Sequence, residues 1–399
     1  MISDFLLGCV IVLQIVTIIL LLLILIKRKK QRNEEYRPAP QDDPDIETDG
    51  LSLEPNMNTN KTNDVNDLPR NLKIDESRVE ICDIIEPGYF FFFEGNLAKL
   101  YQSENKANWI EVCIKSVRNR YDSAAHQQLI MELNLLAGVK NHPNVLPLIG
   151  YIATGKQIRL VYEYLEIGSL QTLVKKFSSN DFANQLVDDG SYNVENPTLD
   201  SDTSRLSTMN LLSFAYQICN GMKHLAENKI INRDLALCNT LVSSNKTIRI
   251  GDFGLARKLD DGISYRVKDM DAAYSIHHTD PSAWDELHFT EKTDVWSFAV
   301  CLWELFSFGE TPYDGIDDVH SFVNSGQRLS QPEYCPNDIF QLMSMCWNSK
   351  PDLRPSFKTC IGLLRQHFES HNLNIVEQIE TKLLAVNESH NKLCEFVRN

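Results

Sequence analysis

The chain has 399 residues, a formal net charge of -15, 43% hydrophobic residues and 23% charged residues. This length allows roughly two or three domains, or one two-lobed domain with extensions. The 17 glycines and 15 prolines are too few for a collagen-like or wholly disordered chain. The acidic balance, with no basic block beyond residue 32, argues against nucleic acid as a partner, because nucleic-acid binding requires neutralisation of phosphates.

An uncharged apolar run at 5–26 lies close to the N-terminus and is followed directly by a basic cluster at 27–32. With a rise of about 1.5 Å per residue, a helix over this run is about 33 Å long and matches the roughly 30 Å hydrocarbon core of a bilayer. A cleaved signal peptide is the alternative, but the run exceeds a usual signal-peptide core and no small-residue cleavage site follows it. The positive-inside rule assigns the basic cluster to the cytosol. We therefore expect a single-pass protein of the cell membrane, with the lipid bilayer as its first partner and its N-terminus outside.

The rest of the chain divides by composition. We expect an extracellular stub at 1–4, a transmembrane helix at 5–26 and a disordered juxtamembrane linker at 27–81, which is rich in Asp, Glu, Asn and Pro. A stub of four residues cannot form a ligand-binding domain, so an outside signal has to act through the helix itself or through a partner, a membrane co-receptor or a second copy in a homodimer. A folded body follows at 82–368, interrupted by a polar insert at about 178–207.

The C-terminal tail at 369–399 carries apolar residues at helical spacing, which predicts a helix. These residues are Ile375, Ile379, Leu383 and Leu384.

Strand-like runs come first in the body, and helices dominate afterwards. Residues 109–115 alternate like a strand that ends on Lys115, and Glu132 lies in a helical stretch at 127–138. A lysine on a strand that pairs with a glutamate on the next helix can be held against the α- and β-phosphates of a nucleotide.

Two short segments carry the strongest chemical signal. Residues 231–239 read Ile-Asn-Arg-Asp-Leu-Ala-Leu-Cys-Asn, and residues 251–254 read Gly-Asp-Phe-Gly. Together they resemble the catalytic loop and the Asp-Phe-Gly turn of protein kinases. The resemblance implies that Asp234 is the base that accepts the substrate hydroxyl proton, and that Asn239 and Asp252 hold Mg²⁺. Amide and carboxylate oxygens are the ligands that this hard cation prefers.

The resemblance covers nearly the whole body. Residues 161–165 are similar to the kinase hinge, whose backbone binds adenine, with Tyr162 at the gatekeeper position. Residues 293–298 are similar to the start of the αF helix, where Asp294 would accept hydrogen bonds from the catalytic-loop backbone. Ala236 stands where serine/threonine kinases usually have a lysine, which favours the tyrosine branch. The polar insert and the single membrane span resemble the split-domain receptor tyrosine kinases.

This family implies an α+β, two-lobed fold, with a β-rich N-lobe on a helical C-lobe and ATP between them. It also implies transfer of the ATP γ-phosphate to tyrosine hydroxyls of protein substrates, with ATP and Mg²⁺ as cofactors. The expected catalytic residues are Asp234, Lys115 and Glu132. The expected nucleotide-binding residues are Lys115, Ile85, Glu163, Leu165, Asn239 and Asp252, of which Asn239 and Asp252 hold the metal.

Several positions depart from the family pattern. Ile85, Pro87 and Phe90 stand where the glycine-rich loop has its three glycines, whose bare backbone approaches the phosphates. Cys238 replaces the arginine typical of tyrosine kinases, and Asn232 replaces the usual histidine of the catalytic loop.

The end of the activation segment departs as well. The Ala-Pro-Glu triplet becomes Asp280-Pro281-Ser282, and Ser275 and His278 stand where tyrosine kinases have Pro and Trp. Without the glutamate of this triplet, Arg354 has to find another acid or become solvated. Together with the altered glycine loop, these changes support an alternative function, that of a pseudokinase acting as a membrane-tethered docking scaffold.

Overall fold

The computed structural model describes residues 68–398 apart from 86–92, 104–105, 120, 156, 178–181, 188–189, 194–204, 260–263 and 267–274. The predicted stub, membrane span and most of the linker lie outside the described residues. Within the described part of the chain, no helix is both long enough and apolar enough to cross a membrane.

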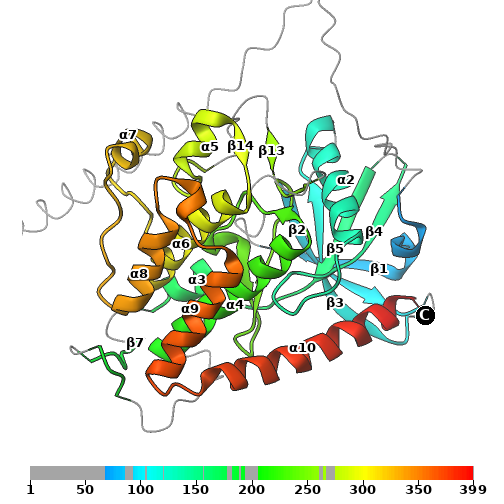
Figure 1. The fold of residues 1–399 in the computed structure, drawn as a ribbon. Helices are drawn as coiled ribbons and strands as arrows, with labels where there is room; N and C mark the ends of the chain where they lie inside the picture. Colours follow the sequence, from blue (N-terminus) through cyan, green and yellow to red (C-terminus); the bar gives the residue numbers. More distant parts are fainter. Residues whose placement is uncertain are drawn as a thin grey trace, which may run out of the picture. The chain divides into compact units, whose positions relative to one another are not determined.

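The N-terminal lobe is a five-stranded antiparallel sheet in the order β1-β2-β3-β5-β4 (Figure 1). Its strands are β1 (Val79–Ile84), β2 (Phe93–Tyr101), β3 (Trp109–Val117), β4 (Leu148–Thr154) and β5 (Gln157–Glu163). Helix α2 (Ser123–Ala137) packs against β4 and β5. It begins four residues earlier than predicted because the Asp122 carboxylate accepts the Ala125 N–H at 2.9 Å and caps the first turn.

The folded body starts before residue 82, which corrects the predicted end of the linker. The 3₁₀ turns η2 (Arg70–Leu72) and η3 (Glu76–Arg78) precede β1. Leu68 and Ile74 are buried, and the Ile74 N–H donates to the Tyr151 carbonyl at 2.8 Å. A few apolar side chains in a polar stretch are enough to dock it on a sheet, and composition averages conceal them.

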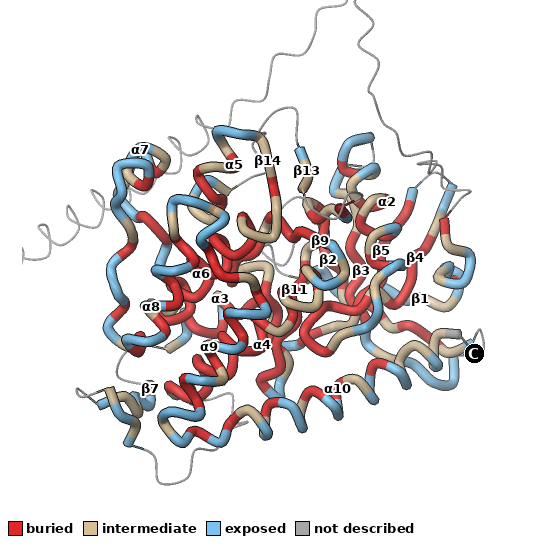
Figure 2. The backbone as a smooth tube through the Cα atoms, in the orientation of Figure 1, coloured by how far each residue is buried: buried red, intermediate tan, exposed pale blue. Residues whose placement is uncertain are grey.

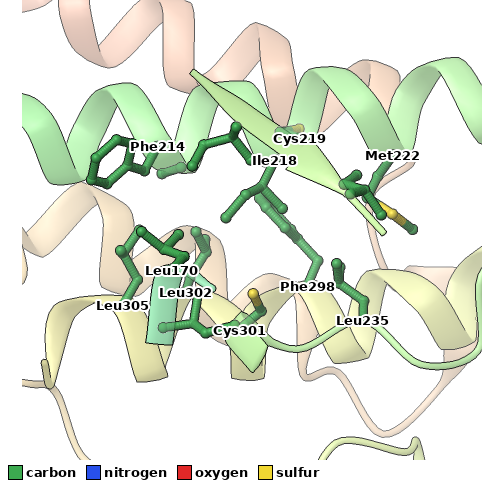
Figure 3. Close-up of a cluster of buried hydrophobic side chains, with 14 of the residues drawn as sticks. Leu170, Phe214, Ile218, Cys219, Met222, Leu235, Phe298, Cys301, Leu302 and Leu305 are labelled. Carbon is green, nitrogen blue, oxygen red and sulfur yellow. The ribbon is translucent and has the colours of Figure 1, made fainter. Parts of the chain in front are cut away.

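The C-terminal lobe is helical, as predicted. Its larger helices are α4 (Thr208–Glu227), α6 (Glu291–Phe306), α8 (Asn337–Cys346) and α9 (Phe357–Ser370). Its shorter helices are α3 (Leu170–Lys175), α5 (Pro281–Glu286) and α7 (Val319–Asn324). Residues of α4 and α6 face each other across a dry core that includes Phe214, Ile218, Phe298 and Leu302 (Figure 3). This core is the rigid base on which the loops of the site rest, and Figure 2 shows its nearly continuous burial.

Short strands and turns shape the loops between these helices. They are β6 (Gly168–Ser169), β7 (Phe182–Ala183), β8 (Leu206–Ser207), β9 (Ile230–Ile231), η4 (Leu237–Asn239), β10 (Thr240–Val242), β11 (Ile248–Ile250), β12 (Arg257–Lys258), β13 (Tyr265–Arg266), β14 (His288–Phe289) and η5 (Pro351–Leu353). The described parts of the insert pack on the helical lobe: Phe182 makes edge contacts with Phe308 and Tyr334, and the Tyr192 hydroxyl lies 2.7 Å from His367 Nε2.

The predicted tail helix is present as α10 (Ile375–Arg398) and runs along both lobes (Figure 1). Of the four apolar residues that predicted this helix, Ile375, Ile379 and Leu383 are buried, whereas Leu384 is 66% exposed. Further along the helix, Val397 packs on the apolar cluster of the N-lobe sheet. The tail is therefore part of the folded body and not an appendage.

Candidate active site

A buried charge cluster joins the two lobes at Lys115. The lysine lies on β3 with a side chain that is 0% exposed, and its Nζ is 2.8 Å from Glu132 Oε2 on α2 and 2.8 Å from Asp252 Oδ1. Burial alone lowers the pKa of a lysine, but the charges of Asp252 and Glu132 outweigh it and raise the pKa of Lys115. The ammonium is thus held charged between one acid from each lobe, in the pairing that the spacing predicted.

The gatekeeper tyrosine completes the environment of Glu132. The Tyr162 hydroxyl donates a hydrogen bond of 2.7 Å to Glu132 Oε1, and the Phe253 N–H lies 3.4 Å from the same oxygen. Burial and the neighbouring Glu132 raise the pKa of Tyr162, so its hydroxyl stays protonated and donates. Sequence reasoning placed Tyr162 at the gatekeeper but did not foresee this bond, which holds α2 toward the site.

Asp294 on α6 holds the catalytic loop through the loop backbone. Its two carboxylate oxygens accept the Asn232 N–H at 2.7 Å and the Arg233 N–H at 2.9 Å, as the resemblance implied. Arg233 has φ 70, in the left-handed region that costs a non-glycine residue energy, so these bonds hold a strained turn. The Asn232 side chain accepts the Asp234 N–H at 3.1 Å. The loop after β9 is thereby bent so that Asp234 faces the cluster.

Asp234 and Asn239 are in direct contact. Asn239 Nδ2 donates to the Asp234 carboxylate and to the Asp234 backbone carbonyl, each at 2.8 Å. Burial and the charge of Asp252 raise the pKa of Asp234 to about 7, while His278 and Asn239 act in the opposite direction. A carboxylate with a pKa near neutrality is suited to accept and release a proton at physiological pH.

The donor set fits a divalent cation. The antiparallel pair β10 and β11 carries Asn239 at its start and Asp252 just beyond its end, so both residues reach one place. The amide nitrogen of Asn239 is bonded to Asp234, so its side-chain oxygen, which has a weak contact of 3.7 Å from Cys238 Sγ, is the atom that could bind a cation. Asp252 has φ 49 and a side chain that is 16% exposed. An amide oxygen and an accessible carboxylate oxygen match the preference of Mg²⁺ for hard oxygen ligands.

Of the predicted nucleotide-binding residues, Glu163 and Leu165 lie at the hinge between the lobes, whereas Ile85 follows β1 in the N-lobe sheet. Leu165 is buried, and the Ile85 N–H donates to the Gly95 carbonyl at 2.9 Å. The Glu163 carboxylate turns away to Arg249 at 3.2 Å and to His390 of α10 at 3.1 Å. Only the backbone of Glu163 is therefore available to a nucleotide. Pro87 and Phe90 lie outside the described residues.

Phe93 was not recognised as a site residue from the sequence. Its ring lies over the Lys115 ammonium, with 4.5 Å from Nζ to the ring centroid, and its side chain is buried. Two carboxylates and one aromatic face therefore surround this cation. The run of aromatic residues after the glycine-loop segment was the signal that could have indicated it.

Arg354 finds its acid two residues before the position where the family has glutamate. Asp280 forms a two-point ion pair with Arg354, including an Nη2–Oδ1 contact of 3.0 Å, and both side chains are 1% exposed. Asp280 is also the cap of α5 and accepts the Ser282 hydroxyl at 2.7 Å. Of the two outcomes expected for Arg354, pairing with another acid is the one observed.

The fold and the cluster define a protein with the architecture of a phosphate-transferring kinase domain. The family model for protein tyrosine and serine/threonine kinases matches residues 92–364, more than half of the chain, and the chain belongs to this family. It is 33% identical over 306 residues to the tyrosine-protein kinase receptor old-1 of Caenorhabditis elegans, covering 74% of this chain and 58% of that protein.

Two further Caenorhabditis elegans proteins are similar. The tyrosine-protein kinase receptor ver-3 is 31% identical over 366 residues, with 83% of this chain and 30% of that protein covered. The receptor-like tyrosine-protein kinase kin-15 is 32% identical over 351 residues, with 82% and 72% covered. The chain thus resembles receptor tyrosine kinases, although it spans only 58% and 30% of the lengths of the first two relatives.

Proposed function

We propose that this chain is a membrane-anchored protein-tyrosine kinase that transfers the γ-phosphate of ATP to tyrosine hydroxyls of protein substrates in a receptor-like signalling role. The observation that carries the proposal is the connected polar set of the site. Lys115 contacts Glu132 and Asp252 at 2.8 Å, and Asn239 contacts Asp234 at the same distance. Kinship with receptor tyrosine kinases supports tyrosine as the acceptor.

Each residue has a distinct task in this proposal. Lys115 orients the α- and β-phosphates, and Glu132 holds Lys115 in place. Asn239 and Asp252 hold Mg²⁺, which when bound neutralises charge on the phosphates. Asp234 accepts the proton of the tyrosine hydroxyl while the tyrosine oxygen bonds to the γ-phosphorus and the bond from that phosphorus to the bridging oxygen breaks, so that ADP leaves. Its contact with Asn239 keeps the base beside the metal ligands, so that proton acceptance and charge neutralisation occur at one place.

The test is phosphate transfer from γ-labelled ATP to tyrosine peptides by the purified full-length chain, beside Asp234→Asn as the matched control. We expect wild type to transfer label to tyrosine and the variant, which keeps the side-chain volume, to lose about 10²–10³-fold or more. Equal transfer by the two proteins would contradict the kinase function.

Nucleotide binding is tested separately from transfer. Mg-ATP is expected to raise the melting temperature, because a ligand that binds the folded state stabilises it by RT ln(1 + [L]/Kd). Since Ile85, Pro87 and Phe90 replace glycines, we expect weak affinity and a shift that requires ATP on the order of millimolar. Lys115→Met should reduce the shift, and an equal shift in both proteins would contradict the role of Lys115.

The second candidate function is that of a pseudokinase, a membrane-tethered scaffold that binds partners without phosphate transfer. Phe93 favours it, because its ring lies over the Lys115 ammonium, 4.5 Å from Nζ to the ring centroid. A nucleotide has to displace this ring or bind beside it. Phe93→Ala is expected to strengthen the Mg-ATP melting shift if the ring competes with phosphate. If wild type transfers phosphate no faster than Asp234→Asn, the scaffold function is supported.

Membrane anchoring is supported by the uncharged run at 5–26 and its basic flank. A tag after Asn399 should fractionate with membranes and resist protease added to intact cells. Digestion of the tag in intact cells, or a soluble full-length chain, would contradict the proposed topology.

A further inference from the structure

In this chain the catalytic loop has no basic residue on the C-terminal side of Asp234. Between this aspartate and Asn239 the loop reads Leu-Ala-Leu-Cys, with Ala236 and Cys238 at the two positions where kinases place a lysine or an arginine. The side chains at these positions are short and uncharged.

A buried acid nevertheless holds this loop. Glu304 on α6 has a side chain that is 1% exposed, and its Oε2 accepts the Leu237 N–H at 3.2 Å. A buried carboxylate is costly unless a cation and hydrogen bonds compensate for its lost hydration. The loop position beside it, Cys238, supplies no such charge.

The cation comes from the activation segment. His278 Nε2 lies 3.0 Å from Glu304 Oε2, an ion-pair distance, and its side chain is largely buried. Its ring is oriented by Ser275 Oγ at 3.0 Å from Nδ1, and its backbone carbonyl accepts the Ser297 hydroxyl at 2.8 Å. The histidine is therefore held by Ser275 and Ser297, within ion-pair distance of the acid that supports the catalytic loop.

Charge supports this placement. Burial lowers the pKa of an imidazole, but Glu304 and Asp234 outweigh burial and raise the pKa of His278. The charged and titratable groups that act on it are Glu304 on α6, Asp234 on the catalytic loop and its neighbour His277. The acids among them favour the imidazolium form.

We propose that His278 is a positioning residue that replaces the missing loop cation, neutralising Glu304 so that this glutamate holds the catalytic loop and Asp234 in place. The inference rests on the proposed kinase function. Because His278 belongs to the activation segment and Leu237 to the catalytic loop, Glu304 connects the two. Movement of the segment then removes the counter-charge of Glu304 and releases the loop.

The activity test compares wild type, His278→Gln and the double variant His278→Gln/Cys238→Arg in the full-length chain. We expect His278→Gln to lower kcat about tenfold or more with an unchanged KM for ATP, because the loop is misplaced but the nucleotide contacts remain. Returning a cation at residue 238 should restore most of kcat. His277→Gln is the matched control, since no contact joins its ring to Glu304 among the described residues, and it should behave as wild type.

A wild-type kcat in His278→Gln, or a loss that Cys238→Arg does not restore, would overturn the inference. Histidine NMR gives a readout that is independent of transfer. The His278 signal, assigned by its absence in His278→Gln, should titrate above the ordinary pKa of about 6.5 and move down in Glu304→Gln. If wild type is no faster than Asp234→Asn, the proposed kinase function fails, and this titration alone decides the ion pair: an unraised pKa overturns it.

Discussion

Two buried charge clusters connect the lobes, one facing the site and one behind the hinge. At the front, Lys115 lies between Glu132 and Asp252. At the back, Glu163 lies between Arg249 and His390. The front holds two carboxylates for one ammonium, whereas the back holds one carboxylate for one guanidinium and a histidine.

This difference in charge balance distinguishes a cluster that is suited to bind a ligand from a cluster that stabilises the fold. Surplus acid in a buried place is unfavourable until a cation arrives, so the front cluster is suited to a charged ligand. The back cluster is balanced and covered by α10, so its charges stabilise the fold. The same acid-to-amide change should therefore act in opposite ways in the two places.

The largest expected effect is on phosphate transfer, from a change in the front cluster at Lys115. Asp252→Asn leaves Lys115 and Glu132 as a balanced pair and removes one of the two proposed Mg²⁺ ligands. Transfer should fall about 10²–10³-fold, whereas the free energy of unfolding in urea should stay the same or rise. A large loss of stability in this variant would mean that Asp252 stabilises the fold. The front and back clusters would then not differ in their roles.

The matched change behind the hinge is Glu163→Gln. It leaves Arg249, whose side chain is 2% exposed, without its acid. Because breaking a buried pair costs roughly 3–5 kcal/mol and Glu163 is 24% exposed, we expect a loss of about 2–3 kcal/mol in urea unfolding. Transfer per folded molecule should fall far less than in Asp252→Asn, and an unchanged stability would contradict the structural role of the back cluster.

Tyr162→Phe sharpens the description of the front. The change keeps the ring and removes the hydroxyl, and with it the 2.7 Å hydrogen bond to Glu132 Oε1. A hydrogen bond to a charged group contributes about 1.5–3 kcal/mol, and we expect the lower end because Lys115 still pairs with Glu132. Urea unfolding measures the loss. Equal stability of the two proteins would show that the bond does not hold α2 in place.

The smallest expected effect is a pH dependence behind the hinge. Burial alone raises the pKa of Glu163, but the His390 hydrogen bond and the Arg249 charge outweigh it and lower the pKa below 4.5. The stability that this acid contributes is therefore present above pH 4.5 and is lost as the pH falls through the lowered value. The difference in unfolding free energy between pH 6 and pH 3 should be smaller in Glu163→Gln than in wild type. An identical pH dependence would contradict the shift.

Two altered motifs show that replacing a family residue does not necessarily remove the interaction that this residue makes. Ser282 removed the expected acid and Cys238 the expected cation, yet Arg354 and Glu304 are both paired, with Asp280 and His278. A buried charge requires a partner, but any side chain that reaches it serves. The glycine loop is different, because its requirement is for bare backbone, which a distant side chain cannot replace.

What the sequence by itself determined is the set of elements and the polar residues of the site. Strand alternation ending at Lys115, the helix that carries Glu132, and the spacing of Asp234, Asn239 and Asp252 are local patterns. Such patterns can be read from the sequence because backbone periodicity and short connections bring these residues to one place. The tail helix was predictable for the same reason.

Only the tertiary structure decided the contacts between segments far apart in the chain. These are the Phe93 ring over Lys115, the turn of Glu163 toward His390, the replacement partners Asp280 and His278, and the path of α10 along both lobes. Apart from the aromatic run that precedes Phe93, these contacts have no local signature, because each depends on which side chain meets a buried charge or an apolar face after the lobes have packed. The desolvation of charge, which exists only in the folded core, selects those partners.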